Sequence, residues 1–305
     1  MADQKSISAI FLSFFFLLLF KSSHGGDIAI YWGQNGDEGS LAETCDTSNY
    51  KIVNIAFLSS FGGGQMPAVN LAGHCDPSFY GGCTFLSPQI SKCQEQGIKV
   101  LLSIGGEAGY YMLDSEDDAK QVAGYLWDSF LGGQSDSRPL GNAVLDGIDF
   151  NIQNGGNLYW DVLAKALKEY SDEIVLAASP QCSYPDDHLN SAIKTGLFDY
   201  VWVQFYNNPS CQYSDDDFKE TLLSSWEQWL KIDANSIFLG LPASPSIGGY
   251  IPPKNFIAEV LPSVQTSSNF GGVMLWDRYY DLKNEYSESI KPSLDNNNNM
   301  MSKTL

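Results

Sequence analysis

Short runs of apolar, β-branched and aromatic residues recur along the chain between residues 28 and 276. Runs of this kind, bounded by turn residues, are typical of buried strands. The predicted strands are Ile28 to Trp32, Lys51 to Phe57, Lys99 to Ile104, Val144 to Phe150, Ile174 to Ala178, Tyr200 to Phe205, Ser236 to Leu241 and Gly272 to Trp276. Between most of these runs, apolar residues recur with the period of a helix, after a residue that can cap it. The predicted helices are Ser87 to Gln96, Ser115 to Leu131, Leu158 to Tyr170, Asp187 to Thr195, Asp215 to Leu230 and Pro253 to Val260.

The alternation of strands and helices predicts the fold. Alternating elements form a parallel sheet, and eight such units in about 280 residues match a closed barrel. The sequence therefore predicts an α/β protein with a single (β/α)8 TIM barrel over residues 26–294. The alternative is a doubly wound open sheet, which would need a G-x-G-x-x-G turn after its first strand. The first predicted strand is followed instead by Gly33-Gln34-Asn35-Gly36.

The two ends of the chain differ from this pattern. At the start, Lys5 precedes the apolar run Ala9 to Phe20, and the small residues Ser23 and Gly25 follow it. We interpret residues 1–25 as a signal peptide, because the apolar run is shorter than the roughly 20 residues that span a bilayer. The tail at 295–305 contains four consecutive asparagines and is predicted to be disordered. The protein is therefore expected to be secreted, either to the extracellular space or, if the tail is a sorting extension, to a vacuole.

The composition narrows the choice of partners. The chain is 44% hydrophobic and 17% charged, which suits a large core, and its formal net charge of −19 argues against a nucleic-acid partner. No segment after the signal peptide is apolar enough to enter a membrane. The acidic runs at 115–118 and 214–217 are typical of helix N-termini, although they also suggest weak calcium binding.

Cysteine and histidine usage bears on metals and redox state. The chain has six cysteines, and a secreted context favours disulfides over metal thiolates. Six cysteines allow about 15 pairings, so their spacing alone does not assign the bonds. Only His74 and His188 follow the signal peptide, and they are far apart in sequence. We predict no metal site and no cofactor.

The predicted strand from Val144 to Phe150 and the three residues after it, up to Gln153, carry a column of polar residues. Side chains alternate between the two faces of a strand, about 6.6 Å apart on one face. The polar set is Asp149, Asn151 and Gln153, and the apolar set is Ile148, Phe150 and Ile152. In a barrel of this kind the apolar set faces the helices and the polar set faces the lumen. The column then forms either a ligand site or a buried hydrogen-bonded ladder without a ligand.

At these residues the sequence resembles the plant class III chitinases of glycoside hydrolase family 18. Their signature on the fourth strand is Asp-x-x-Asp-x-Asp-x-Glu, and the segment Asp146 to Gln153 matches it except at the last two functional positions. Four other segments resemble the first, third, sixth and eighth strands of that family: Ile28 to Asn35, Ser103 to Gly106, Gln204 to Asn208 and Met274 to Trp276. The resemblance covers nearly the whole chain after the signal peptide.

The resemblance implies a role for each matching position. In that family the substrate's own N-acetyl oxygen is the nucleophile. A glutamic acid protonates the leaving oxygen, an aspartate orients the acetamido group, a tyrosine hydrogen-bonds the attacking oxygen and a tryptophan floors the pocket. The acid position is Gln153, the acetamido position is Asn151, the tyrosine is Tyr206 and the tryptophan is Trp276. The remaining predicted substrate-binding residues are Asp149 as the buried partner of the acetamido position, Asp146, Tyr31 and Gln204.

The resemblance also implies the disulfide pattern. The pairs are Cys45 with Cys93, Cys75 with Cys83, and Cys182 with Cys211.

The substitutions at positions 151 and 153 decide the predicted function. An amide has no titratable proton near neutral pH, so general acid catalysis at Gln153 is lost, a contribution of about 10²- to 10⁴-fold. Our leading hypothesis is a lectin-like binder of chitin or N-acetylglucosamine oligosaccharides with little or no activity, serving defence or storage. One alternative is an active endo-chitinase with a displaced acid, for which Glu107 is the candidate. Another is a proteinaceous inhibitor of microbial glycosidases.

Overall fold

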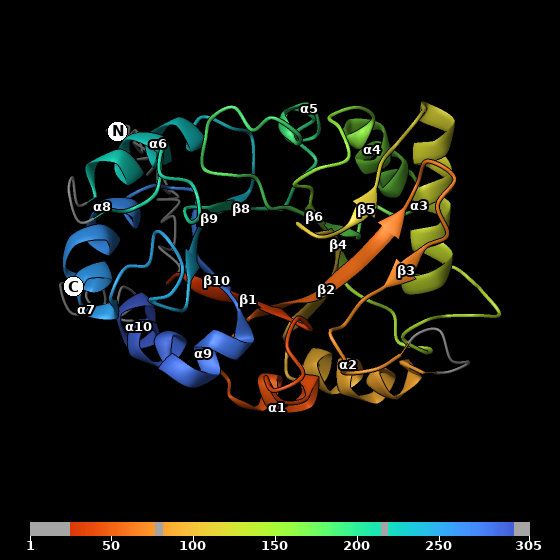
Figure 1. The fold of residues 1–305 in the computed structure, drawn as a ribbon, viewed down its shortest axis with the longest axis horizontal. Coiled ribbons are helices and arrows are strands. Elements are labelled where there is room, and N and C mark those ends of the chain that lie inside the picture. Colours follow the sequence, from red (N-terminus) through yellow and green to blue (C-terminus); the bar gives the residue numbers. More distant parts are fainter. Residues whose placement is uncertain (1–24, 77–81, 215–218, 296–305) are drawn as a thin grey trace, which may run out of the picture.

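A barrel of parallel strands forms the centre of the molecule (Figure 1). The structure is a computed structural model that describes residues 25–76, 82–214 and 219–295. Within these ranges the strands are β1 (Asp27–Trp32), β2 (Ile52–Phe61), β3 (Ala68–Val69), β4 (Lys99–Gly105), β5 (Tyr110–Tyr111), β6 (Gly147–Asn151), β7 (Val175–Ala178), β8 (Tyr200–Gln204), β9 (Ser236–Pro242) and β10 (Phe270–Trp276).

The barrel closes because β1 pairs in parallel with both β10 and β2. The order around it is β1-β10-β9-β8-β7-β6-β4-β2, and all of these neighbours are parallel. The two-residue strands β3 and β5 only extend the far end of β2. The predicted (β/α)8 barrel is therefore confirmed, and each predicted strand corresponds to one barrel strand.

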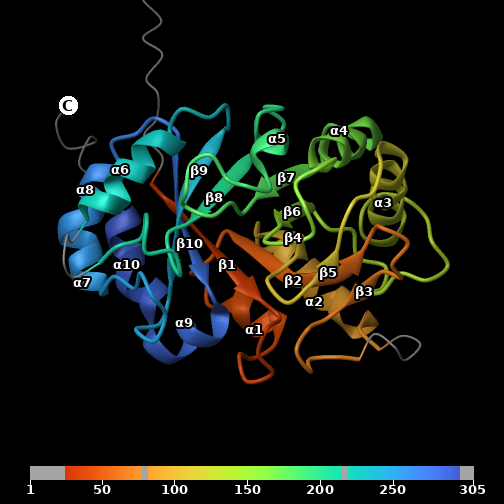
Figure 2. The same ribbon diagram turned by 45° about the horizontal axis from the view of Figure 1, so that its top comes forward.

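Helices surround the barrel, as the tilted view also shows (Figure 2). They are α1 (Leu41–Asp46), α2 (Ser87–Glu95), α3 (Glu116–Phe130), α4 (Trp160–Tyr170), α5 (Asn190–Ile193), α6 (Glu220–Trp229), α7 (Pro253–Asn255), α8 (Leu261–Val264), α9 (Arg278–Asn284) and α10 (Tyr286–Asp295), with a 3₁₀ turn at Thr84–Leu86 and a π-helical turn at Phe256–Val260.

Several predicted helices differ from the observed ones. The predicted helix from Asp187 is reduced to the single turn α5, because the Asp186 carboxylate first accepts from the backbone N–H groups of His188 and Leu189 in a separate turn. The predicted helix from Pro253 is interrupted by the π-helical turn. The sequence analysis missed α1, α8, α9 and α10. Helix α10 also ends at Asp295, so the predicted tail is one residue shorter, and its remaining residues lie outside the described part of the chain.

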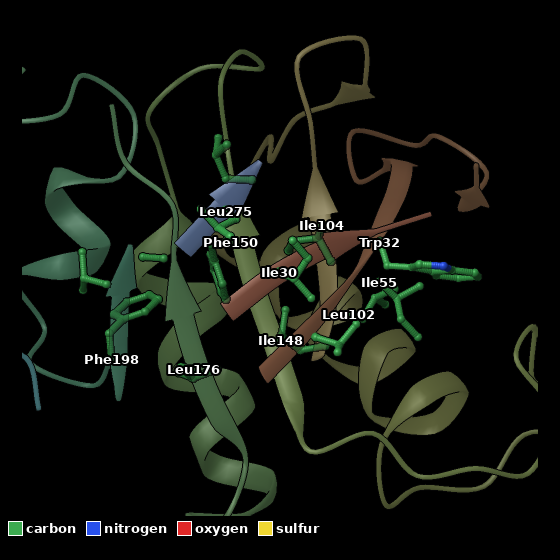
Figure 3. Packing of buried hydrophobic residues seen from close by; sticks show 14 of the residues in the cluster. Ile30, Trp32, Ile55, Leu102, Ile104, Ile148, Phe150, Leu176, Phe198 and Leu275 are labelled. Atoms are coloured by element: carbon green, nitrogen blue, oxygen red, sulfur yellow. The ribbon is translucent and has the colours of Figure 1, made fainter. Parts of the chain in front are cut away.

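The apolar core has two layers, separated by the barrel wall. The larger layer lies between strands and helices, where Ile148 and Phe150 of β6 pack among side chains of neighbouring elements (Figure 3). The smaller layer fills the lumen with aromatic and small residues, among them Tyr31, Phe57 and Trp202. The apolar set of the β6 column therefore faces the helices, as period two predicts. The polar set of the column faces the lumen and is available to form a site.

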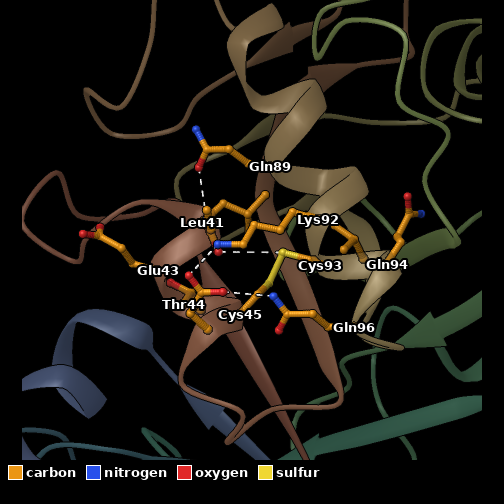
Figure 4. Close-up of a disulfide and its surroundings, with 12 residues drawn as sticks. Leu41, Glu43, Thr44, Cys45, Gln89, Lys92, Cys93, Gln94 and Gln96 are labelled. Carbon is orange, nitrogen blue, oxygen red and sulfur yellow. Dashed lines mark hydrogen bonds and ion pairs between the residues drawn. A yellow bond between two sulfur atoms is a disulfide. The ribbon is translucent and has the colours of Figure 1, made fainter.

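The three disulfides join Cys45 with Cys93, Cys75 with Cys83, and Cys182 with Cys211, which confirms the predicted pattern. The first joins α1 to α2, and Figure 4 shows this disulfide between Cys45 and Cys93. A hydrogen bond from the Ala42 backbone N–H to Gln89 Oε1 also connects the two helices. The third joins the loop after β7 to the loop after β8. Both of these loops belong to the end of the barrel that carries the site.

The predicted signal peptide falls almost wholly on residues 1–24, outside the described part of the chain. Among the described residues, none of the helices combines the length and hydropathy needed to cross a membrane.

Candidate functional site

Strand β6 presents the polar column to the lumen. Asp149 and Asn151 are buried, and Gln153, just past the end of the strand, is partly exposed. The column therefore runs from the closed interior of the barrel to the open end at which the strands terminate. A column that reaches solvent at its last member can meet a ligand there.

Asp149 is the anchor of the column. Its carboxylate accepts hydrogen bonds from four side chains of other strands and loops: Tyr31 Oη at 2.7 Å, Ser103 Oγ at 2.6 Å, Ser179 Oγ at 2.8 Å and Trp202 Nε1 at 2.9 Å. Burial raises the pKa of Asp149, and the four donors act against that rise because they stabilise the ionised form. Asp149, the predicted buried partner, therefore has side-chain hydrogen-bond donors for both of its carboxylate oxygens.

The two amides continue the column as a ladder. Asn151 Nδ2 donates to Tyr31 Oη at 3.1 Å, and Gln153 Nε2 donates to Asn151 Oδ1 at 2.8 Å. Tyr31 lies at the centre of this network, and its hydroxyl also contacts Ser179 Oγ. Burial and then the Asp149 charge hold the pKa of Tyr31 well above its ordinary value, so its hydroxyl keeps its proton. Asp149, Tyr31, Asn151 and Gln153 therefore form one continuous chain of hydrogen bonds.

The ladder opens into a cleft of about 360 Å³. Four predicted site residues line it: Gln153, Gln204, Tyr206 and Trp276. The cleft also contains residues that the sequence analysis did not single out for the site: Phe57, Gln181, Ser183, Asp186, Asp187, His188, Asn207 and Asn208. A larger hollow of about 1620 Å³ lies beside β3 and residues 134–142, and it contains none of the predicted catalytic or substrate-binding residues.

Tyr206 and Trp276 give the cleft a hydroxyl and a flat apolar wall. Burial, followed by the Asp277 and Asp149 charges, holds the pKa of Tyr206 well above its ordinary value. The hydroxyl therefore stays protonated and can donate a hydrogen bond. The Trp276 ring is partly exposed and packs against Tyr31 and Phe57, with ring centroids 5.4 Å and 6.0 Å away. A ring held on one side and open on the other suits stacking against a sugar.

The segment that follows β4 and includes β5 fixes the position of Gln153. The backbone N–H groups of Gln153 and Asn154 both donate to Tyr111 Oη, at 3.0 Å and 3.3 Å. Gly105 allows this loop to approach β6 closely, because at its φ of +107° a Cβ atom would lie 2.3 Å from the Asn151 carbonyl oxygen. Gln153 is consequently held in two ways: its backbone N–H donates to Tyr111, and its side-chain amide donates to Asn151.

The predicted substrate-binding residues Asp146 and Tyr31 do not line the cleft, and Tyr31 is fully buried beneath it. Asp146 lies at the opposite end of β6, where its carboxylate accepts from the Val100 backbone N–H and from Gln94 Nε2, both at 2.9 Å. The structure therefore does not bring Asp146 to the site, because it precedes the strand that carries the column. Gln204 does line the cleft, and its Nε2 donates to the Ser179 carbonyl oxygen at 2.6 Å.

The sequence analysis missed most of the partners that satisfy Asp149. Ser103 falls within a segment that the analysis quoted, but nothing in its local pattern indicated that it meets β6. Ser179 and Trp202 come from the strands β7 and β8 and their ends, and carry no motif. Their positions follow only from strand register in the closed barrel.

The described residues contain no group of three or more His, Cys, Asp or Glu side chains arranged to hold a metal ion. The acidic run at 115–118 begins α3, where Ser115 caps the helix and Asp118 accepts from the backbone N–H groups of Gly63 and Asp114. This run forms the N-terminus of a helix, as its composition predicts. Weak calcium binding stays a prediction.

The chemistry available at the site follows from its donors and acceptors. The group at the open end of the column is a neutral amide, which binds hydrogen-bonding groups but transfers no proton. Carboxylates do line the same cleft, at Glu107, Asp186 and Asp187. Asp186 is buried and already accepts three backbone N–H groups, including that of Gln181, whereas Glu107 is exposed. The geometry suits recognition of a neutral, polar ligand with an apolar face.

Comparison with known proteins gives consistent results. The family model described as glycosyl hydrolases family 18 matches residues 27–248. An acidic endochitinase from Cucumis sativus is 59% identical over 289 residues, covering 93% of this chain and 97% of that protein. A xylanase and α-amylase inhibitor protein from Scadoxus multiflorus is 47% identical with a TM-score of 0.82, covering 87% and 98%. A tamarind chitinase-like lectin is 38% identical with a TM-score of 0.78, covering 87% and 99%.

Proposed function

Because the chain belongs to glycosyl hydrolase family 18, we propose that its cleft binds N-acetylglucosamine oligosaccharides and cleaves them very slowly or not at all. The observation that carries this proposal is the hydrogen bond from Gln153 Nε2 to Asn151 Oδ1. It joins two amides at the positions where the family's mechanism needs an acid and a charged aspartate. The expected role is that of a lectin-like defence or storage protein.

The loss of activity has two physical causes. Gln153 cannot protonate the leaving oxygen, and general acid catalysis is worth about 10²- to 10⁴-fold, or roughly 3 to 5 kcal/mol of barrier. Asn151 provides no negative charge to stabilise the cation that develops as the N-acetyl oxygen attacks. Since both effects concern the transition state, binding of the intact sugar is spared.

The features that support binding are those left unchanged. Trp276 offers one open face, and Tyr206 offers a protonated hydroxyl. Gln153 itself keeps the size of a glutamate and retains polar contacts. The tamarind relative is named a lectin, which supports a binding role for this fold without requiring cleavage.

Calorimetric titration with chitotetraose tests the proposal. The wild-type protein should bind it, and sugar recovered after the titration should be intact by mass spectrometry. Trp276→Ala should weaken binding at least about tenfold, because it removes the stacking face. A matched control is Trp127→Ala, which removes a partly exposed tryptophan of α3 that lies outside the cleft and should leave the affinity unchanged. Absence of binding heat in the wild type would overturn the proposal.

An active endochitinase is the second candidate, and the 59% identical acidic endochitinase supports it. It would need a carboxylate in place of Gln153, and the exposed Glu107 lines the same cleft. If Glu107 is a displaced acid, Glu107→Gln should abolish the release of reducing ends from glycol chitin. No change on this substitution would exclude that role.

Inhibition of a foreign glycosidase is the third candidate, supported by the 47% identical xylanase and α-amylase inhibitor. Titration of a fungal xylanase and an α-amylase with the protein would separate this role from sugar binding. The signal-like segment at 1–25 and the three disulfides support our proposal that the protein is secreted.

A further inference from the structure

We infer that Gln153 makes the cleft selective for the free end of a sugar chain, whose hydroxyl donates to Gln153 Oε1, over a chain that continues past this point through a glycosidic oxygen. The inference rests on the proposed function, because it assumes that the sugar lies in the cleft at Gln153. It adds which part of the ligand the site recognises.

The polarity of the ladder begins at Tyr31. A phenol hydroxyl has one hydrogen, and here it donates to Asp149 Oδ2 at 2.7 Å. The only other oxygen that could take this hydrogen within the buried network is Ser179 Oγ, which also contacts Tyr31. In either case Tyr31 donates its hydrogen to a buried group and not to Asn151. Tyr31 can therefore only accept from Asn151.

This requirement orients both amides. Asn151 must turn Nδ2 toward Tyr31 Oη, as observed at 3.1 Å, so its Oδ1 points along the column toward Gln153. That oxygen is an acceptor and requires a donor, which is Gln153 Nε2 at 2.8 Å. The orientation of Gln153 is thus fixed by the order of donors and acceptors that starts at the buried Asp149 carboxylate. A glutamic acid that acts as a proton donor would present a hydrogen to the cleft, whereas Gln153 presents an oxygen.

The group that Gln153 presents to the cleft is then Oε1. Among the residues that the structure describes, no donor hydrogen-bonds this oxygen, and it is not one of the buried unpartnered atoms, so it is open to a ligand. A hydroxyl can donate to it and can accept from the remaining Nε2 hydrogen. A glycosidic oxygen has no hydrogen, so it can accept from this Nε2 hydrogen but cannot donate to Oε1, which is left without a donor.

The experiment compares two ligands that differ in one group. Chitotriose has a free anomeric hydroxyl, whereas its methyl β-glycoside carries a glycosidic oxygen at the same place. Titration calorimetry with the wild-type protein should give an affinity about threefold to tenfold higher for chitotriose, the value of one neutral hydrogen bond. This comparison uses the unaltered protein and does not depend on the folding of a variant.

Two variants assign the preference to Gln153. Gln153→Met removes both polar atoms at similar size and should bind the two ligands with equal affinity. Gln228→Met is the matched control, because it makes the same change in an exposed glutamine of α6 outside the cleft, and the ratio of affinities should stay at its wild-type value.

The outcomes separate this inference from the proposed function. If neither ligand binds the wild-type protein, the sugar site is wrong and the inference fails with it. If both bind with equal affinity, or if the methyl glycoside binds more tightly, the site stands and the inference is overturned. A preference that persists in Gln153→Met would also overturn it.

Discussion

Asp149 holds together the polar interior of the barrel, because it combines full burial with four side-chain donors. A buried carboxylate is tolerated only when its oxygens are supplied with hydrogen bonds. In this protein the donors also determine which way the amides above it point. A residue deep in the barrel thereby sets the orientation of the amide that lines the cleft.

Removal of one donor should be measurable as a loss of stability. Trp202→Phe deletes the Nε1 donor to Asp149 while keeping an aromatic ring against Tyr200 and Phe238. Trp226→Phe is a matched control, because Trp226 is also buried between two rings but its Nε1 has no partner among the described residues. Urea unfolding should show Trp202→Phe to be less stable than Trp226→Phe by about 1 to 3 kcal/mol. Equal losses would contradict the role of the donor.

The sequence was sufficient to predict the column of polar residues, but not the side chains that donate hydrogen bonds to Asp149. Strand periodicity alone placed Asp149, Asn151 and Gln153 on one face, and it also separated them from the apolar set. The same local rule could not show that Asp146 lies at the far end of the strand, since that depends on where β6 begins. Nor could it supply Ser179, which reaches Asp149 only through the pairing of β6 with β7.

Helix α9 ties the wall of the cleft to the body of the protein. It begins immediately after Trp276, and its N-cap is Asp277, whose side chain accepts from the Tyr280 backbone N–H. Burial raises the pKa of Asp277 to about 7, the Tyr280 N–H acts against the rise, and the nearby Glu38 charge adds to it. The cap therefore titrates near neutral pH, well above the range of an ordinary aspartate.

This shift predicts a dependence of stability on pH. Below about pH 3, Asp277 is protonated in both the folded and unfolded states, so it does not change the free energy of unfolding. As the pH rises toward 7, the unfolded chain releases this proton more readily than the folded one, so the free energy of unfolding falls. The loss from this group is at most about 4 kcal/mol and levels off above pH 7.

Asp277→Asn should remove this loss, because an asparagine caps the helix without ionising. We expect the difference between its free energy of unfolding and that of the wild type, measured in urea at pH 4, 6 and 8, to grow in favour of the variant as the pH increases. Asp187→Asn changes an exposed carboxylate and should follow the wild-type curve. Parallel curves for Asp277→Asn and the wild type would contradict the assignment.

Element boundaries were predicted where a cap and a periodic face coincide. For α3, Ser115 and the amphipathic pattern after it predicted both ends of the helix almost to the residue. Helix α9 was missed because its cap follows the last strand directly, so the strand pattern obscured its start. Helix α10 contains Pro292, which argues against a helix interior by propensity, yet its buried Ile290 and Leu294 pack against the body of the protein. Tertiary packing outweighs local preference there.

The architecture of the whole barrel explains how amides can stand at the two family positions while the cleft keeps its shape. The barrel supplies the cleft from the ends of several strands, and a disulfide joins two of the loops that contribute Gln181, Ser183 and Asn208. The two amides replace carboxylates of similar size within this frame. The alternation of elements was sufficient to predict the barrel, whereas the cleft walls depend on loops whose conformations have no periodic pattern.

The most direct test is the rate of reducing-end release from saturating chitotetraose by the wild-type protein and by the double variant Gln153→Glu with Asn151→Asp. The account predicts that restoring the acid and the charge together raises the rate at least about 10²-fold, with similar affinity for the sugar. A wild-type protein that already matches the double variant would contradict the claim that proton transfer is the missing step.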